Sequence, residues 1–194
     1  MHALPLKTAL VIIDVQTAID DPSWGRRNNP QAEARIADLL AAWRATQRPI
    51  IHVRHMSREP QSTYRPNQPG NEFKPEVAPR PGERVIEKST NSAFIGTPLE
   101  SELRAGEIYT LVIVGVITNN SVEATARMAG NLGFETYVVA DATATFDRID
   151  FEGQPHPAAE VHAMSLANLN GEYATVVYTT DILNSIGQPT VGTE

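Results

Sequence analysis

Apolar residues gather in six short runs along the chain, and a helical spacing of apolar positions follows every run except the second. The runs cover residues 8–15, 50–53, 84–87, 108–116, 136–140 and 173–178. Apolar, β-branched runs of this length are typical of strands that are buried on both faces. Their alternation with helices predicts the α/β class, with a six-stranded, mostly parallel sheet in a three-layer α/β/α arrangement.

The segment between the second and third runs differs from the others. Residues 56–83 contain six prolines and no regular apolar pattern. A loop of this length inside a compact domain is usually functional. We therefore expect a proline-rich flap over a site, with a turn of helix where the chain crosses between the two strands. The length predicts a single domain over residues 1–194.

Composition narrows the range of functions. The 23 acidic and 16 basic residues give a net charge of −7, which argues against a nucleic-acid partner. The apolar runs are shorter than the roughly 20 residues of a spanning helix, and the first residues do not resemble a secretion signal. We therefore expect no membrane partner and a cytoplasmic location. The sequence has no cysteine, which excludes disulfides and thiolate chemistry.

Three polar residues lie where predicted strands end. Asp14 closes the first strand, Lys88 follows the third, and Ser121 lies after the fourth, where a helix begins. Ligands of parallel sheets bind at these carboxyl ends. An acid, a cation and a hydroxyl could there serve as proton acceptor, charge partner and nucleophile in covalent acyl transfer. Equally, Asp14 and Lys88 could form a structural ion pair, with Ser121 capping the helix.

Other chemistries find little support in the sequence. His52 and His55 lie together at a strand end, where paired histidines are more often structural than metal ligands, and we predict neither a metal nor a cofactor. Ser121 lacks the flanking glycines of a nucleophile elbow, and the chain has no glycine-rich phosphate-binding motif.

Five segments carry a family resemblance by their order and spacing. They are residues 11–16 (VIIDVQ), 88–94 (KSTNSAF), 115–125 (GVITNNSVEAT), 127–134 (RMAGNLGF) and 139–147 (VADATATFD). Together they resemble the isochorismatase-like, or cysteine hydrolase, superfamily. The resemblance implies a six-stranded parallel sheet and a triad of Asp, Lys and Cys that hydrolyses small amides, ureas or related compounds through a thioester.

The resemblance assigns roles to particular residues. Asp14 and Lys88 match the family's acid and lysine, and the position of the cysteine falls on Ser121. The family's cis peptide bond falls between Val116 and Ile117, and the backbone N–H groups of Ile117 and Ser121 would stabilise the substrate oxyanion.

The resemblance also implies a pocket and partners. Gln16, Trp24, Phe94 and Asn120 are expected to line the pocket of a small-molecule substrate, although Trp24 and Phe94 could equally be ordinary packing residues. Family members commonly form dimers or tetramers in which one subunit completes the site of another. We therefore expect a homodimer or homotetramer.

Serine at position 121 decides how active the chain can be. A helix N-terminus and a lysine readily convert a thiol to its thiolate, whereas a serine hydroxyl is too weak an acid for the carboxylate of Asp14 to deprotonate. We therefore expect weak or no amide hydrolysis from this chain. The serine has two explanations, an inactivated cysteine-to-serine form or natural divergence, and the sequence does not separate them.

Three functions follow from these alternatives. The first is hydrolysis of a non-peptide C–N bond with Asp14, Lys88 and position 121 as the triad. The second is vinyl-ether hydrolysis of isochorismate or a relative, as in isochorismatases proper, which lack the cysteine and use the aspartic acid to protonate the substrate. The third is a binding protein that retains the pocket without catalysis.

Overall fold

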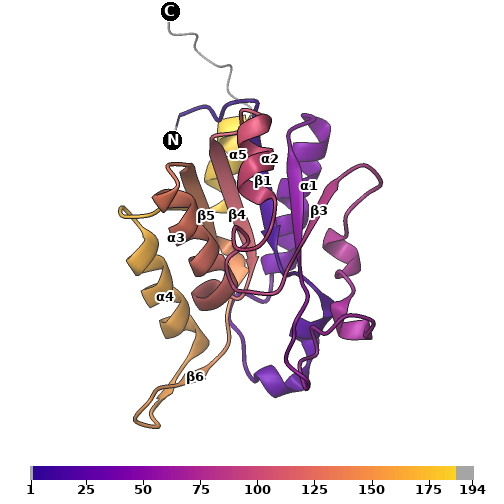
Figure 1. The fold of residues 1–194 in the computed structure, drawn as a ribbon. Helices are drawn as coiled ribbons and strands as arrows, with labels where there is room; N and C mark the ends of the chain where they lie inside the picture. The colour runs from indigo at the N-terminus through magenta and orange to yellow at the C-terminus, as the bar shows by residue number, and fades with distance from the viewer. Residues whose placement is uncertain (1, 187–194) are drawn as a thin grey trace, which may run out of the picture.

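A six-stranded parallel sheet runs through the middle of the molecule (Figure 1). The computed structural model describes residues 2–186. The strands follow the order β3-β2-β1-β4-β5-β8, and every neighbouring pair is parallel. They are β1 (Thr8–Ile13), β2 (Ile50–His55), β3 (Arg84–Lys88), β4 (Thr110–Val116), β5 (Glu135–Ala144) and β8 (Thr175–Val177). The predicted fold class is confirmed.

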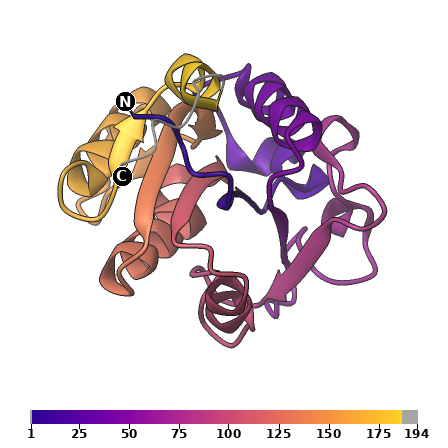
Figure 2. The ribbon, with the colours of Figure 1, turned by 90° about the horizontal axis from the view of Figure 1, so that it is seen from above.

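Helices cover both faces of this sheet. They are α1 (Ala32–Ala45), α2 (Leu99–Ala105), α3 (Glu123–Asn131), α4 (Ala158–Leu169) and α5 (Thr179–Ile186). Figure 2 shows α1 and α5 on one side of the sheet, with α2 and α3 on the other. Alternate residues of β1 point to opposite faces of the sheet. Leu10 and Ile12 pack with α1 on one face, and Val11 and Ile13 pack with α2 and α3 on the other. Within residues 2–186, no helix has the length and apolar character needed to cross a membrane.

A short hairpin after β5 was not predicted. Strand β5 continues to Ala144, beyond the expected end at residue 140, and is followed by the antiparallel pair β6 (Arg148–Ile149) and β7 (Pro155–His156). The hairpin projects beyond the end of the sheet (Figure 1). Strands of two residues carry no periodic pattern, so the sequence offers no signal for them.

The proline-rich segment is tied to the end of β1 rather than free. It contains two short 3₁₀ turns, η3 (Pro69–Asn71) and η4 (Pro75–Val77), which take the place of the expected turn of helix. The Lys74 N–H donates to the Val15 carbonyl at 3.1 Å, and the Thr17 N–H donates to the Glu72 carbonyl at 2.8 Å. These bonds fix one part of the segment against the edge where the strands end.

The end of β4 depends on a glycine. Gly115 has a φ of 116°, and a Cβ atom there would lie 2.1 Å from the Ile13 carbonyl oxygen of the neighbouring β1. Only glycine combines this backbone conformation with so close an approach. Gly115 therefore allows the carboxyl ends of β1 and β4 to lie against each other, immediately beside the residues discussed below.

The start of β3 is held by the half-buried carboxylate of Glu83, the residue that precedes the strand. Glu83 accepts hydrogen bonds from Arg44 Nε at 2.7 Å, from the Arg80 N–H at 2.9 Å and from His52 Nε2 at 2.8 Å. Burial alone would raise the pKa of Glu83, but these hydrogen bonds outweigh burial and lower the pKa to about 2. The cluster therefore explains His52 as a structural residue that joins β2 to the start of β3.

Replacing Glu83 by Gln should make stability less dependent on pH. Because the folded-state pKa is depressed, the ionised Glu83 stabilises the fold at pH values above its unfolded value of 4.5, and this contribution is lost as pH falls toward about 2. Because water partly screens this half-buried group, we expect Glu83→Gln to lower the free energy of unfolding by about 1–2 kcal/mol at pH 7 and by almost nothing near pH 2. Urea unfolding across this range measures the difference, and Glu76→Gln, at an exposed position nearby, is the control. A difference that is constant with pH would contradict the assignment.

Candidate functional site

Four polar residues meet where adjacent strands end. Asp14 directly follows β1, His55 is the last residue of β2, and Lys88 is the last residue of β3. Ser121 lies in η5 (Thr118–Val122), a π-helical turn that joins β4 to α3. Since β3, β2, β1 and β4 are neighbours in the sheet, their carboxyl ends bring these side chains to one place.

Asp14 and Lys88 form a buried ion pair. Lys88 Nζ donates to Asp14 Oδ2 at 2.6 Å, and the side chains are 0% and 6% exposed for Lys88 and Asp14 respectively. Asp14 has a φ of 54°, in the left-handed region that few non-glycine residues adopt. Its backbone carbonyl accepts a hydrogen bond from the Tyr64 hydroxyl at 3.2 Å. Asp14 is thus held in place by contacts of both its side chain and its backbone.

Lys88 also reaches the other two residues. Its Nζ lies 3.2 Å from Ser121 Oγ, 3.2 Å from His55 Nδ1 and 3.0 Å from the Thr90 carbonyl oxygen. An ammonium group has three protons and no acceptor, so these three atoms and Asp14 Oδ2 share its donors. The structure therefore brings together the three residues predicted as a triad, with the lysine between the other two.

One oxygen of Asp14 is left without a partner. Asp14 Oδ1 is buried, and no side chain or backbone group of residues 2–186 donates a hydrogen bond to it. Buried carboxylate oxygens are normally hydrogen-bonded. Asp14 and Ser121 line the same cavity, so the Asp14 carboxyl group is placed to exchange a proton with a group that binds there.

Hydrogen bonds within the turn that carries Ser121 hold it in shape. The Ile117 carbonyl accepts from the N–H groups of Asn120 at 3.0 Å and Val122 at 3.3 Å. The peptide bond between Val116 and Ile117 is cis. Both residues line the cavity described next.

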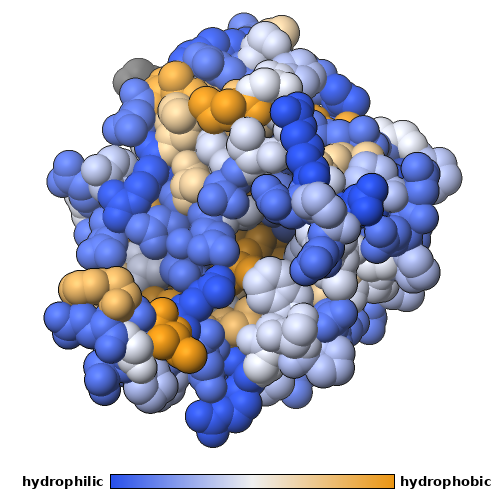
Figure 3. Space-filling model, turned by 60° about the horizontal axis from the view of Figure 1, so that its bottom comes forward, coloured by the Kyte–Doolittle hydropathy of each residue, from blue (hydrophilic) through white to orange (hydrophobic). Residues whose placement is uncertain are grey.

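A cavity of about 120 Å³ opens beside these groups. Its lining consists of Asp14, Trp24, His55, Ser62, Tyr64, Asn91, Val116, Ile117, Asn120 and Ser121. From this end of the molecule the surface is hollowed near its middle, and mostly polar residues surround the hollow (Figure 3). The cavity suits a small molecule with polar groups, because its walls are mostly polar.

Two of the four predicted lining residues are found in the lining. Trp24 lies in the wall, where it stacks on Phe146 with ring centroids 5.4 Å apart and donates from Nε1 to the Ala18 carbonyl at 2.9 Å. Asn120 is also in the wall. With its amide oxygen turned toward Arg148, it accepts from Nη2 at 3.2 Å and donates to the Asn119 carbonyl at 3.1 Å.

The other two predicted lining residues lie outside the lining. Gln16 is fully buried, and its amide bonds to the backbone of His55 and to the Asn71 carbonyl. Phe94 stacks on Phe134, with centroids 5.8 Å apart, inside the core between the sheet and α2. We therefore correct both assignments: Gln16 ties the cavity wall to the proline-rich segment, and Phe94 is a packing residue.

Several lining residues were missed by the sequence analysis. His55 could have been found, because it ends a strand as Asp14 and Lys88 do. Ser62 and Tyr64 come from the proline-rich segment, where no periodic pattern indicates which side chains point inward. Burial raises the pKa of Tyr64 well above its ordinary value, with Asp14 adding to the effect, so its hydroxyl remains a donor.

Residues 2–186 contain no group of three or more His, Cys, Asp or Glu side chains placed to hold a metal ion. The positions around Lys88 are also unsuited to one, because a buried ammonium group lies at their centre.

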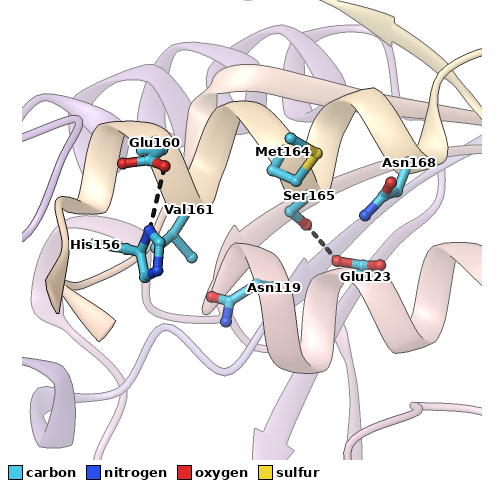
Figure 4. A pocket seen from close by; sticks show the side chains of 8 residues that line it. All are labelled: Asn119, Glu123, His156, Glu160, Val161, Met164, Ser165 and Asn168. Carbon is cyan, nitrogen blue, oxygen red and sulfur yellow. Dashed lines mark hydrogen bonds and ion pairs between the residues drawn. The ribbon is translucent and has the colours of Figure 1, made fainter. Parts of the chain in front are cut away.

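A second, larger groove lies between α4 and the segment from η5 to α3. Figure 4 shows its carboxylates engaged with neighbours: Glu123 accepts from Ser165 at 2.5 Å, and Glu160 pairs with His156 at 3.2 Å. The groove measures about 380 Å³ and holds none of the predicted triad. The cavity beside Asp14 is therefore the candidate active site, since it combines a buried ion pair with an unpartnered carboxylate oxygen.

Comparison with known proteins places this arrangement in a family. The model of the isochorismatase domain matches residues 8–181. A crystal structure of an isochorismatase-family protein from Chromobacterium violaceum is 59% identical and superposes with a TM-score of 0.94, covering 96% of this chain and 97% of that one.

Two further proteins are similar to this chain in sequence. The isochorismatase family protein YrdC of Bacillus subtilis is 44% identical over 178 residues, which cover 92% of this chain and 95% of that protein. The ureidoacrylate amidohydrolase RutB of Methylobacterium radiotolerans is 27% identical over an alignment of 220 positions, covering 95% of this chain and 81% of that protein.

Proposed function

Since the chain belongs to the isochorismatase family of hydrolases, we propose that its site hydrolyses a non-peptide C–N bond in a small amide or urea. The observation that carries the proposal is the contact of Lys88 Nζ with both Asp14 Oδ2 and Ser121 Oγ, at the wall of a small polar cavity. The name of the relative RutB, an amidohydrolase of a ureido compound, agrees with this class of substrate.

The chemistry proposed for the site requires a nucleophile at position 121. With a thiol there, Asp14 accepts the thiol proton and the sulfur attacks the substrate carbonyl carbon. The carbonyl oxygen becomes an oxyanion, which accepts hydrogen bonds from the backbone N–H groups of Ile117 and of residue 121. When the tetrahedral intermediate collapses, the C–N bond breaks and the nitrogen takes the proton from Asp14.

Water completes the cycle. It adds to the thioester carbonyl and gives its proton to Asp14, after which the C–S bond breaks, the acid leaves and the thiol regains its proton. Lys88 holds the Asp14 carboxylate in place through the 2.6 Å hydrogen bond from its Nζ. The chain as it stands has Ser121, whose hydroxyl is far less acidic than a thiol, so we propose that it binds such substrates and turns them over slowly.

The variant Ser121→Cys tests the proposal. We expect ammonia release from some member of a panel of small amides and ureas to rise by about 10³-fold or more over the unmodified chain. Ser101→Cys is the control, because it introduces a thiol at an exposed position of α2. A panel on which the Ser121→Cys protein stays silent, while a known amidase is active, would contradict the proposal.

One observation favours a second candidate. Asp14 Oδ1 is buried and accepts no hydrogen bond from residues 2–186, and Ser121 is a weaker nucleophile than a thiol. Both features favour a reaction in which the Asp14 carboxyl group protonates a vinyl ether and no covalent bond to residue 121 forms. In that case the unmodified chain releases pyruvate from isochorismate, and Ser121→Cys adds nothing. Binding without turnover in both forms would instead indicate a binding protein.

A further inference from the structure

His55 lies between the buried lysine and the cavity. Its backbone is fixed by Gln16: the His55 N–H donates to Gln16 Oε1 at 2.7 Å, and its carbonyl accepts from Gln16 Nε2 at 3.1 Å. The ring packs edge-on against Tyr64, with centroids 5.5 Å apart and an angle of 84° between the planes. The imidazole is therefore held in one place and orientation.

The contact with Lys88 decides which ring nitrogen carries the proton. Lys88 Nζ lies 3.2 Å from His55 Nδ1. An ammonium group can only donate, so Nδ1 must offer its lone pair, and the proton of the neutral ring must lie on Nε2. Nε2 has no hydrogen-bond partner among the described residues, and, unlike Nδ1 of His52, it is not enclosed. Nε2 is thus accessible on a residue that lines the cavity, where a bound molecule can meet it.

We propose that His55 is a substrate-binding residue, a neutral imidazole whose Nε2–H donates to a second oxygen of the substrate, away from the C–N bond that is cleaved. This inference rests on the function proposed above and narrows it, because it calls for an amide or urea with a further carbonyl or carboxylate oxygen. The cavity has few other donors for a substrate oxygen, since the protons of the Lys88 ammonium are shared among Asp14, His55, Thr90 and Ser121.

Burial favours the neutral form of the ring. Burial lowers the pKa of His55, the carboxylate of Asp14 opposes this effect, and the ammonium of Lys88 adds to it. The titratable groups that face the ring are thus Asp14 after β1, Lys88 on β3 and the un-ionised Tyr64 from the proline-rich segment. A neutral ring is the form that the geometry requires, and it persists into mildly acidic solution.

Histidine nitrogen NMR on the unmodified chain tests the tautomer without any turnover. With nitrogen-15 labelled histidine, and with the His55 signals assigned by their loss in His55→Gln, we expect a neutral ring protonated at Nε2 at pH 7. His156 is the internal control, because its hydrogen bonds to Asp150 and Glu160 raise its pKa, so it should gain its second proton at a higher pH than His55. A proton on Nδ1, or a charged His55 at pH 7, would overturn the proposal.

Two matched ligands test the binding role in the same samples. Malonamide has two carbonyl oxygens, whereas butyramide has a similar length and only one. We expect malonamide to shift the Nε2–H signal of His55 and butyramide to leave it nearly unchanged. Equal shifts with both ligands, or no shift with either at saturating concentration, would overturn the role of His55 even if Ser121→Cys confirms the proposed hydrolysis.

Two substitutions of His55, made in the Ser121→Cys protein, test the roles of the two ring nitrogens separately. His55→Asn keeps an acceptor near Nδ1 for Lys88 but loses the donor at Nε2, while His55→Gln can place its amide N–H near Nε2. For malonamide we expect His55→Asn to raise KM about tenfold with little change in kcat, and His55→Gln to recover much of this loss. A fall in kcat at constant KM in both variants would overturn substrate binding and indicate that the ring acts only through Lys88.

Discussion

Asp14→Asn in the Ser121→Cys protein should return ammonia release to the background of the uncatalysed reaction, a loss of about 10³-fold or more. The amide keeps the shape of the carboxylate but accepts protons very poorly, so the thiol at position 121 loses its proton acceptor and the leaving nitrogen loses its proton donor. Among the described residues that line the cavity, Asp14 is the one carboxylate, so no other carboxylate there is placed to take over this work.

The measurement needs a control that loses a carboxylate without touching the cavity. Asp20→Asn serves, because Asp20 lies a few residues further along and pairs with Lys74 at the surface. Its kcat should stay within about twofold of the Ser121→Cys parent. Circular dichroism should show both asparagine variants folded. A folded Asp14→Asn protein as active as its parent would refute the proton-transfer role of Asp14, and with it the proposed mechanism.

The fold could be predicted because its signals are strong and local. Strands β1 and β4 are buried along their whole length, and such strands appear in a sequence as unbroken apolar runs. Asp14, Lys88 and Ser121 followed from the same signal, since the residue after a strand in a parallel sheet must lie at its carboxyl edge. The site was therefore predictable to the extent that strands define it.

The parts built by loops were not predictable in the same way. Tyr64 reaches the cavity from a segment whose position depends on hydrogen bonds of single residues, such as Asn71 Nδ2 to the Tyr64 carbonyl at 2.8 Å. Gln16 is close to Asp14 in sequence but is fully buried and lies outside the cavity lining. The left-handed backbone at Asp14 turns the chain, and Gln16 ends on the far side of the wall, against Asn71 and His55.

Lys88→Met should produce the largest loss of stability among single substitutions in the site. The change removes the cation from a pair whose side chains are almost fully buried and leaves the carboxylate of Asp14 without compensation in a poorly hydrated place. Removing one partner of such a pair costs about 3–5 kcal/mol of the free energy of unfolding. Lys7→Met is the control: it breaks the exposed pair of Lys7 with Glu107, where the expected loss is below about 1 kcal/mol.

The double variant Asp14→Asn with Lys88→Met distinguishes this explanation from a simple loss of packing. If an unpaired buried charge causes the loss, then removing that charge as well should restore about 2 kcal/mol or more relative to Lys88→Met alone. If the lysine stem contributes mainly by its contacts, the two losses should instead add. Urea unfolding of the four proteins at pH 7 measures the coupling. Because the two charges are buried and 2.6 Å apart, we expect the losses not to add. Additive losses would show that Asp14 and Lys88 contribute to stability independently, and would contradict the prediction.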